Sequence, residues 1–258
     1  MLHIWPVPVF ADNYVWVLER EGVDRVAIVD PGDASPVIAA LEDRGLEVAA
    51  VLVTHHHQDH VGGLSRIVRH FRPAVYGSGD DSIAGVDHPV GDGDTVSIPD
   101  LDLDLGVVAL PGHTMNHLGF VAPEIAFVGD TLFAGGCGRV FEGTPAEMHD
   151  SLMRLAALSP GTKAYCAHEY TIANLRFARL VEPENPALAV RLQAAEAARA
   201  SGRPTVPSTI AFERKTNPFL RCSKPAVVAA AETRAGRPLK PGAEVFTVIR
   251  GWKDGWSG

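Results

Sequence analysis

Residues 48–53 and the segment that follows them constrain the fold of this chain more than any other feature. Residues 48–53 (VAAVLV) form a short, valine-rich apolar run typical of a buried strand. Residues 54–60 (THHHQDH) then bring four histidines and one aspartate together, and an apolar helical pattern begins at Leu64. The polar segment is therefore expected to be the loop at the carboxyl end of a strand, where a rigid scaffold presents several side chains to one point.

The imidazole and carboxylate groups of this loop indicate a metal site. They suit borderline cations such as zinc, iron and manganese, whereas a structural zinc site would be expected to use cysteine. A solvated histidine loop or a run of helix-capping residues is the alternative, but five donors in one loop favour metal binding. One loop cannot complete the coordination of a metal centre, so further ligands are expected elsewhere in the chain.

Three later segments repeat the arrangement of an apolar strand followed by polar donors, and they add His113, Asp130 and His168. Taken singly, each is more often a helix cap, a turn former or a hydrogen-bonded surface residue than a ligand. With the first loop they make five histidines and two aspartates, as many protein ligands as two adjacent ions need if one carboxylate bridges them. His117 is expected to support a ligand, and His56 to point away from the site.

The composition is that of an acidic globular protein. With 258 residues, 46% of them hydrophobic, the chain can bury a substantial core in one large domain or two moderate ones. No apolar run reaches the length of a membrane span, and residues 1–10 lack signal-peptide features, so no membrane partner is expected. The net charge of −8 argues against nucleic acid as a partner. Three cysteines without a framework spacing fit a reducing compartment, and we expect a cytoplasmic monomer.

The N-terminal part of the chain is predicted to begin with strands. They are expected at residues 7–10, 14–18 and 25–30. Ser35 is predicted to cap the first helix, which ends at Gly45.

The middle of the chain is predicted to alternate helix and strand. A helix is expected at residues 64–71 and a short strand at 74–77. Residues 95–110 alternate apolar and polar side chains and predict one half-buried antiparallel strand. A capping box at Thr144 predicts a further helix.

The sequence changes character after Tyr170. Helices are predicted at residues 175–181, 186–200 and 225–235, the last capped by Ser223, with no strand between them. We therefore expect a metal-binding domain at residues 1–170 and a helical domain at residues 171–258, which the resemblance described below implies to be the catalytic and the substrate-binding domain.

These motifs resemble those of the metallo-β-lactamase superfamily, and within it the glyoxalase II (hydroxyacylglutathione hydrolase) family. The ligand pattern Thr54-His55-x-His57-x-Asp59-His60, followed by His113, Asp130 and His168, carries the first resemblance. The second extends through the segments 129–133 (GDTLF), 136–139 (GCGR), 141–144 (FEGT), 168–171 (HEYT) and 217–221 (NPFLR). The resemblance implies an α+β fold: a four-layer αββα sandwich with the site at one edge of its two sheets, and a smaller all-helical C-terminal domain.

The resemblance also implies a reaction, which is hydrolysis of S-(2-hydroxyacyl)glutathione, with S-lactoylglutathione as the expected substrate, in the second step of methylglyoxal detoxification. The expected cofactors are two divalent ions, zinc first, with iron or manganese as other options. One ion would be held by His55, His57 and His113, the other by Asp59, His60 and His168, with Asp130 as the bridge. Asp59 and Asp130 would be the catalytic residues, acting with a bridging hydroxide. The glutathione thioester would be contacted by Arg139, Phe141, Tyr170, Arg250 and Lys253.

Two positions depart from the family pattern. Phe141 stands where the family has a tyrosine, and Asn116 where it usually has a glycine. Asparagine tolerates positive φ, so the turn at Asn116 is expected to survive. The alternatives to this function are an iron-dependent glutathione persulfide dioxygenase of the same superfamily, an RNA-processing relative and a metal-binding protein without catalysis. The seven ligands argue against a mononuclear site, and the acidic composition argues against RNA.

Overall fold

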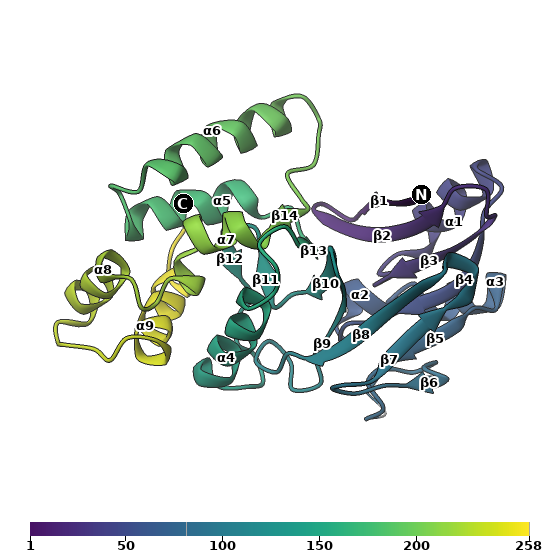
Figure 1. Ribbon diagram of the computed structural model, residues 1–258, viewed down its shortest axis with the longest axis horizontal. Coiled ribbons are helices and arrows are strands. Elements are labelled where there is room, and N and C mark those ends of the chain that lie inside the picture. Colours follow the sequence, from purple (N-terminus) through teal and green to yellow (C-terminus); the bar gives the residue numbers. More distant parts are fainter. Residues whose placement is uncertain (81, 258) are drawn as a thin grey trace. The chain divides into compact units, whose positions relative to one another are not determined.

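The computed structural model describes residues 1–80 and 82–257, which separate into two units. Unit 1 comprises Met1–Ala109 and Asn116–Gly129, and unit 2 comprises Leu110–Met115 and Asp130–Gly258. Each unit is built of strands and helices (Figure 1).

The first sheet of unit 1 carries the histidine-rich loop. Its strands, in order across the sheet, are β1 (Leu2–Val9), β2 (Asn13–Arg20), β3 (Arg25–Val29), β4 (Glu47–Leu52), β5 (Ala74–Gly77) and β6 (His88–Pro89). The first three are antiparallel neighbours, whereas β3 to β6 run parallel. The carboxyl ends of β3 and β4 therefore lie at the same edge, and the loop of residues 53–57 begins there.

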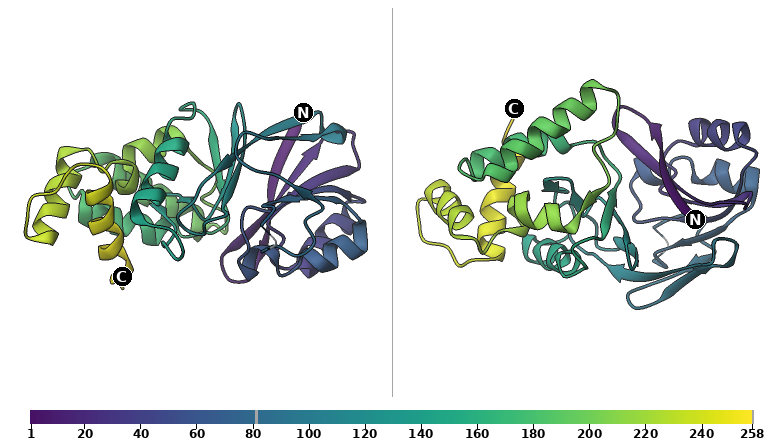
Figure 2. Two further views of the ribbon diagram at one scale, coloured as in Figure 1. Left: turned by 90° about the horizontal axis from the view of Figure 1, so that it is seen from below. Right: turned by 45° about the horizontal axis from the view of Figure 1, so that its top comes forward.

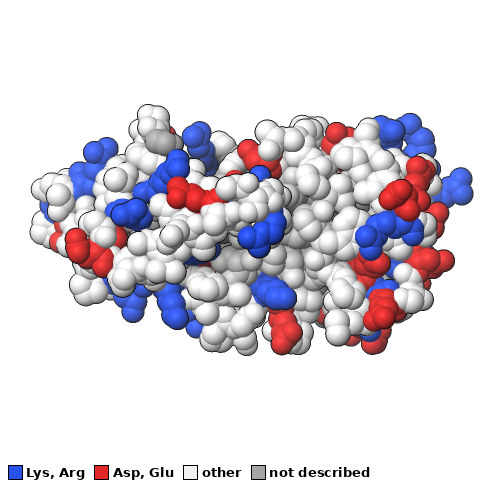
Figure 3. Space-filling view, turned by 90° about the horizontal axis from the view of Figure 1, so that it is seen from above, with Lys and Arg blue, Asp and Glu red and all other residues white. Residues whose placement is uncertain are grey.

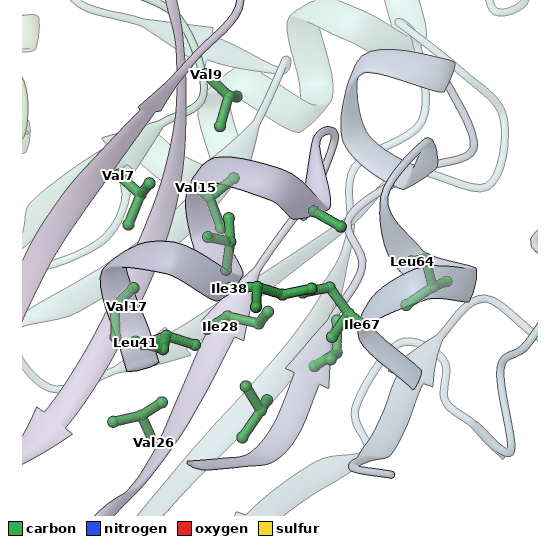
Figure 4. Packing of buried hydrophobic residues seen from close by; sticks show 14 of the residues in the cluster. Val7, Val9, Val15, Val17, Val26, Ile28, Ile38, Leu41, Leu64 and Ile67 are labelled. Atoms are coloured by element: carbon green, nitrogen blue, oxygen red, sulfur yellow. The ribbon is translucent and has the colours of Figure 1, made fainter. Parts of the chain in front are cut away.

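Helices α1 (Ala34–Asp43) and α3 (Leu64–Phe71) cover one face of this sheet (Figures 1 and 2). Figure 4 shows Ile38 and Leu41 of α1 and Leu64 and Ile67 of α3 pointing toward the strands, where they share one buried cluster with strand residues such as Ile28. The removal of these aliphatic side chains from water holds helix and strand together and fixes the sheet edge.

The cap predicted for the first helix is wrong by two residues. The Asp33 side chain accepts a hydrogen bond from the Ser35 backbone N–H at 2.9 Å, so Asp33 is the N-cap and Ser35 lies within the helix. Both residue types cap well, and the sequence alone could not decide which carboxylate or hydroxyl faces the first turn.

The second sheet of unit 1 is antiparallel. Its strands are β7 (Thr95–Ile98), β8 (Leu103–Ala109), β9 (Leu118–Ala122) and β10 (Ile125–Gly129). The single strand predicted at residues 95–110 is wrong, because a 3₁₀ turn, η1 (Pro99–Leu101), and Asp102, with φ of 44°, fold this segment into a β7–β8 hairpin. Proline removes a ladder donor, which explains the interruption.

Unit 2 contains two pairs of short strands and most of the helices. The strands are β11 (Leu132–Phe133) with β12 (Gly136–Cys137), and β13 (Lys163–Cys166) with β14 (Ser208–Thr209). The helices are α4 (Pro145–Ala156), α5 (Thr171–Val181), α6 (Pro186–Ala200), α7 (Ile210–Thr216), α8 (Pro225–Ala235) and α9 (Ala243–Asp254), with a 3₁₀ turn η2 (Pro218–Leu220). The capping box predicted at Thr144 is confirmed.

Two details of unit 2 differ from the sequence predictions. Lys224, which makes no side-chain cap, occupies the N-cap of α8 in place of Ser223. The two-residue strand β14 interrupts the helices of the C-terminal part and pairs with β13. A strand this short leaves too few residues to show a period of two. Among the described residues, no helix has both the length and the apolar character that a membrane crossing requires.

Candidate metal centre and binding cavity

The loop after β4 presents the donors of unit 1. His55 and His60 are fully buried, whereas His57 and Asp59 are half-buried. The short helix α2 (Gln58–Val61) begins just after His57 and carries Asp59 and His60. A Cβ at Gly32 would lie 1.8 Å from the Asp59 carbonyl oxygen, so only glycine lets α2 approach the β3–α1 loop this closely.

The carboxylate of Asp30, at the end of β3, orients two of these histidines. It accepts hydrogen bonds from the Thr54 backbone N–H at 2.8 Å and from the Thr54 hydroxyl at 2.7 Å. The His60 Nδ1 lies 3.0 Å from the same carboxylate, and the His55 Nδ1 lies 3.0 Å from the Thr54 hydroxyl oxygen. The Thr54 hydroxyl already donates to Asp30, so its oxygen accepts from the His55 Nδ1, and the Asp30 carboxylate can only accept from the His60 Nδ1. Each neutral ring then has its lone pair on Nε2.

These Nε2 atoms face other candidate metal ligands of the loop. The His60 Nε2 lies 3.6 Å from Oδ2 of Asp59, and the His55 Nε2 lies 3.1 Å from Nδ1 of His57. Asp59 is itself held by the Asn13 side-chain amide, which donates to its Oδ2 at 3.1 Å. A lone pair and a carboxylate oxygen that face each other repel, so the His60–Asp59 arrangement suits a cation.

Two other histidines of this region have different surroundings. The ring of the buried His117 stacks on His55, with centroids 4.8 Å apart and planes at 22°. His56 directs Nδ1 to the side-chain oxygen of Asn116 at 3.2 Å. The expectations that His117 supports a ligand and that His56 stays outside the ligand set remain predictions.

Unit 2 has a second donor group built on three loops. Oδ2 of Asp130 lies 3.5 Å from Nε2 of His113 and 3.3 Å from Nε2 of His168. The His113 Nδ1 donates to the Arg139 carbonyl at 2.8 Å, so its neutral ring also directs a lone pair toward the carboxylate. A Cβ at Gly138 would lie 2.0 Å from the Asp130 carbonyl oxygen, so this position requires glycine.

The chemistry of both groups fits a divalent cation of borderline hardness. Imidazole nitrogens and carboxylate oxygens converge in each unit, and Nδ1 hydrogen bonds leave Nε2 of His55, His60 and His113 as acceptors. In metal-binding histidines, the ring nitrogen that does not bind the metal usually donates a hydrogen bond of this kind. The described residues thus contain histidine and aspartate clusters of the kind that hold metal ions.

A cavity of about 500 Å³ in unit 2 contains the residues predicted to bind substrate. His113 and Asp130 lie in its wall. All five predicted contacts line it, namely Arg139, Phe141, Tyr170, Arg250 and Lys253. Other lining residues that the sequence did not single out are Phe133, Cys137, Asn174 and Trp256.

The three cations of this cavity have different environments. Arg250 is buried and donates from Nη1 to the Cys137 carbonyl and from Nη2 to Asp254, both at 2.9 Å. Arg139 is exposed, with its Nε 3.7 Å from Asp254. The Lys253 ammonium lies 4.3 Å from the centre of the Trp256 ring, a cation–π contact. Burial and then the positive charge of Arg250 lower the pKa of Lys253 to about 8.

Aromatic rings and a thiol form the rest of the wall. The Tyr170 ring stacks on His168, with centroids 4.6 Å apart and planes at 8°. Phe141, which is 61% exposed, packs edge-on against His113 at 5.2 Å. Cys137 is buried, and burial raises the pKa of its thiol to about 11.

Comparison with known proteins identifies the family. The model of the metallo-beta-lactamase superfamily matches residues 10–168, and the model of the hydroxyacylglutathione hydrolase C-terminus matches residues 169–256. The hydroxyacylglutathione hydrolase of Alkalilimnicola ehrlichii is 52% identical over 98% of this chain and 99% of its own length. The chain belongs to the hydroxyacylglutathione hydrolase family. The hydroxyacylglutathione hydrolase of Nitrosomonas europaea is 45% identical over 100% of this chain and 98% of its own length.

A solved structure agrees with the fold expected for a hydroxyacylglutathione hydrolase family member. The crystal structure of ETHE1 from Myxococcus xanthus superposes with a TM-score of 0.66, covers 98% of each chain and is 21% identical in sequence. The predicted fold class, a metallo-beta-lactamase fold followed by a helical C-terminal region, is thereby confirmed.

Proposed function

We propose that this chain hydrolyses S-(2-hydroxyacyl)glutathione, with S-lactoylglutathione as its substrate, in the second step of methylglyoxal detoxification. Relatives of that name, 52% and 45% identical over nearly full length, support the assignment. The observation that carries it is the cavity of unit 2, in which His113 and Asp130 share a wall with Arg139, Arg250 and Lys253. Metal-type donors and a cationic surface are what a metal-dependent hydrolase of an anionic thioester needs.

We assign two divalent ions to the chain, zinc first, with iron or manganese as alternatives. In this proposal His55, His57 and His113 hold one ion, Asp59, His60 and His168 hold the other, and Asp130 belongs to both. The Nδ1 hydrogen bonds described above support the assignment, because they place the ring proton on Nδ1 and the lone pair on Nε2, the atom with which a neutral imidazole of this tautomer would bind an ion. When bound, such a pair of ions supplies a hydroxide nucleophile at neutral pH and polarises the substrate carbonyl.

The residues of the cavity recognise the thioester in this proposal. Arg139, Arg250 and Lys253 pair with the glutathione carboxylates, and the rings of Phe141 and Tyr170 flank the thioester. In unit 2, lysine and arginine outnumber aspartate and glutamate although the whole chain carries −8, and blue side chains are spread over the part of unit 2 visible in Figure 3. This local excess of positive charge attracts an anionic substrate against the global charge. The thiolate of glutathione leaves without needing a proton donor.

We further propose that residues 1–170 form the catalytic domain and residues 171–258 the substrate-binding domain. The boundaries of the two family matches, 168 and 169, support this division. Helix α9 then contributes Arg250 and Lys253, and the segment after β12 contributes Arg139.

Elemental analysis of the purified full chain, combined with the loss of thioester absorbance of S-lactoylglutathione, tests the reaction. Two ions and thioester hydrolysis are expected. Oxygen uptake with glutathione persulfide, without thioester hydrolysis, would instead identify a dioxygenase.

Alanine variants of Arg139 and Lys253 test recognition of the glutathione carboxylates. Hydrogen bonds to charged groups are worth about 1.5 to 3 kcal/mol, so Lys253→Ala should lose roughly ten- to a hundredfold in kcat/KM, mainly through KM. Arg139→Ala should lose about two- to fivefold, because an ion pair at an exposed side chain contributes less. Arg179→Ala is the matched control, because Arg179 is an exposed arginine of α5 that does not line the cavity. Equal losses of kcat/KM for S-lactoylglutathione and for a small uncharged thioester would show that these residues do not bind the glutathione part of the substrate.

A further inference from the structure

A second cavity of unit 2, which we call the α6 groove, has no part in the function proposed above. Its volume is about 630 Å³, and it shares no lining residue with the cavity that contains Lys253. Its lining includes Ala187, Val190 and Ala194 of α6 and Phe212 of α7. A volume of this size is in the range of small-molecule sites.

The α6 groove exposes apolar surface to water. Val190 is 70% exposed and Phe212 is 55% exposed, and both line the groove. The alanines of α6 provide no side chain long enough to fill the space between them. Apolar surface that is both concave and exposed is a common property of binding sites.

The wall of the groove is held in place by hydrogen bonds. The Thr205 backbone N–H donates to Glu169 at 2.9 Å, and the Thr205 and Thr171 hydroxyl oxygens lie 2.6 Å apart. Arg191 donates to the Ser208 hydroxyl at 2.8 Å and also binds Glu213. The groove is therefore a preformed feature whose opening needs no rearrangement of these side chains.

The charges along the groove select an anion. Among its described lining residues there are two basic side chains, Arg191 and Lys215, and no acidic one. Glu213 neutralises Arg191. Lys215 is exposed, and no ion pair with it is found in the part of the chain that the structure describes. Lys215 is therefore the lining cation to which an anionic ligand could bind.

We propose that the α6 groove binds a medium-chain fatty acid anion, with its alkyl chain along α6 and its carboxylate at Lys215. The apolar lining with one free cation matches a ligand that is apolar over its length and anionic at one end. The space is concave and has a volume of about 630 Å³, which suits one small ligand.

Calorimetric titration of the full chain with decanoate, below the critical micelle concentration, tests the proposal. One saturable site is expected. Octanoate should bind more weakly by roughly fourfold for each methylene removed, because each buried methylene contributes a constant increment. Decanol should bind about two- to fivefold more weakly than decanoate, since an exposed ion pair contributes little. Absence of saturable decanoate binding, or equal binding of decanol, would overturn the proposal.

Substitutions locate the ligand. Val190→Glu places a carboxylate in the groove at an exposed position and should weaken decanoate binding at least about tenfold. Lys215→Ala should weaken it about two- to fivefold, and Lys215→Arg should restore it. Lys224→Ala is the matched control, because Lys224 is exposed and does not line the groove. Unchanged melting temperatures would confirm that the variants fold.

Two further outcomes would show that the ligand binds elsewhere or that the groove has a different occupant. Decanoate that inhibits thioester hydrolysis competitively, and does so equally in Val190→Glu, would lie in the cavity of Lys253 and overturn the proposal. The chain could instead self-associate through the groove. Self-association that is abolished by Val190→Glu but unaffected by decanoate would show this, and would also overturn the proposal of fatty acid binding. The calorimetric binding itself does not depend on the proposed hydrolase activity, so either proposal can fail alone.

Discussion

The carboxylate of Asp30, in the loop after β3, and Nδ1 of His60, in helix α2, lie 3.0 Å apart and are both buried. Asp30 also accepts two hydrogen bonds from Thr54. In Asp30→Asn, one carboxylate oxygen becomes an amide donor, so these three bonds can no longer all be kept. We expect metal affinity to fall about 10- to 100-fold, measured by competition with a chelator of known affinity. Asp33→Asn is the matched control, because asparagine caps a helix as well as aspartate. Equal affinities of the two variants would contradict the role of Asp30.

Removal of Asp130 is expected to weaken the binding of both metal ions. Its Oδ2 lies 3.5 Å from Nε2 of His113 and 3.3 Å from Nε2 of His168. Without this carboxylate, two adjacent cations would repel each other with less screening. Elemental analysis should give about two ions per wild-type chain and fewer for Asp130→Ala, with His56→Ala unchanged. Metal loss in the His56 variant alone would refute the ligand assignment.

Phe141→Tyr should be tolerated. The ring is 61% exposed, so an added hydroxyl at its edge has access to solvent. A new hydrogen bond to the substrate would tighten binding by about 0.5 to 1.5 kcal/mol, visible as a lower KM for S-lactoylglutathione. A large fall in kcat/KM would instead show that the apolar ring edge is required.

The activity is expected to depend on pH through Lys253. Its pKa is lowered to about 8, mainly by burial and then by Arg250, so the free enzyme loses this positive charge as pH rises through 8. The KM for an anionic thioester should therefore rise above about pH 8, while KM for an uncharged thioester stays level. In Lys253→Arg the rise should disappear, because a guanidinium keeps its proton throughout this range. The same rise in the arginine variant would assign the effect to another group.

The ligand set and the fold were predictable for different reasons. Each donor segment, such as the loop at His55 or the turn at Asp130, follows an apolar strand, and that pattern is local in sequence. Asp30 was not predicted to matter, although it also ends a strand. Its role arises because β3 and β4 are parallel neighbours, which sets Asp30 beside Thr54. Pairing of strands that are distant in sequence is not visible in a local pattern.

The binding cavity shows the same limit. Arg250 and Lys253 could be placed on one helical face from their spacing. Tertiary packing, which the spacing does not show, buries Arg250 against the Cys137 carbonyl and places Lys253 against the Trp256 ring. Similarly, Ser35 was predicted as the cap of α1, whereas Asp33 is the cap, because both residue types cap well and only the folded chain shows which side chain meets the first turn.

The buried thiol of Cys137 bears on the fate of the acyl group. Thioesters transfer their acyl groups readily to thiolates, and Cys137 lines the cavity in which we expect the thioester to bind. With a pKa raised to about 11, roughly one molecule in ten thousand carries the thiolate at pH 7. A bound substrate therefore meets a cysteine that is a poor acyl acceptor, and the enzyme is protected from acylating itself with the compound it is proposed to remove.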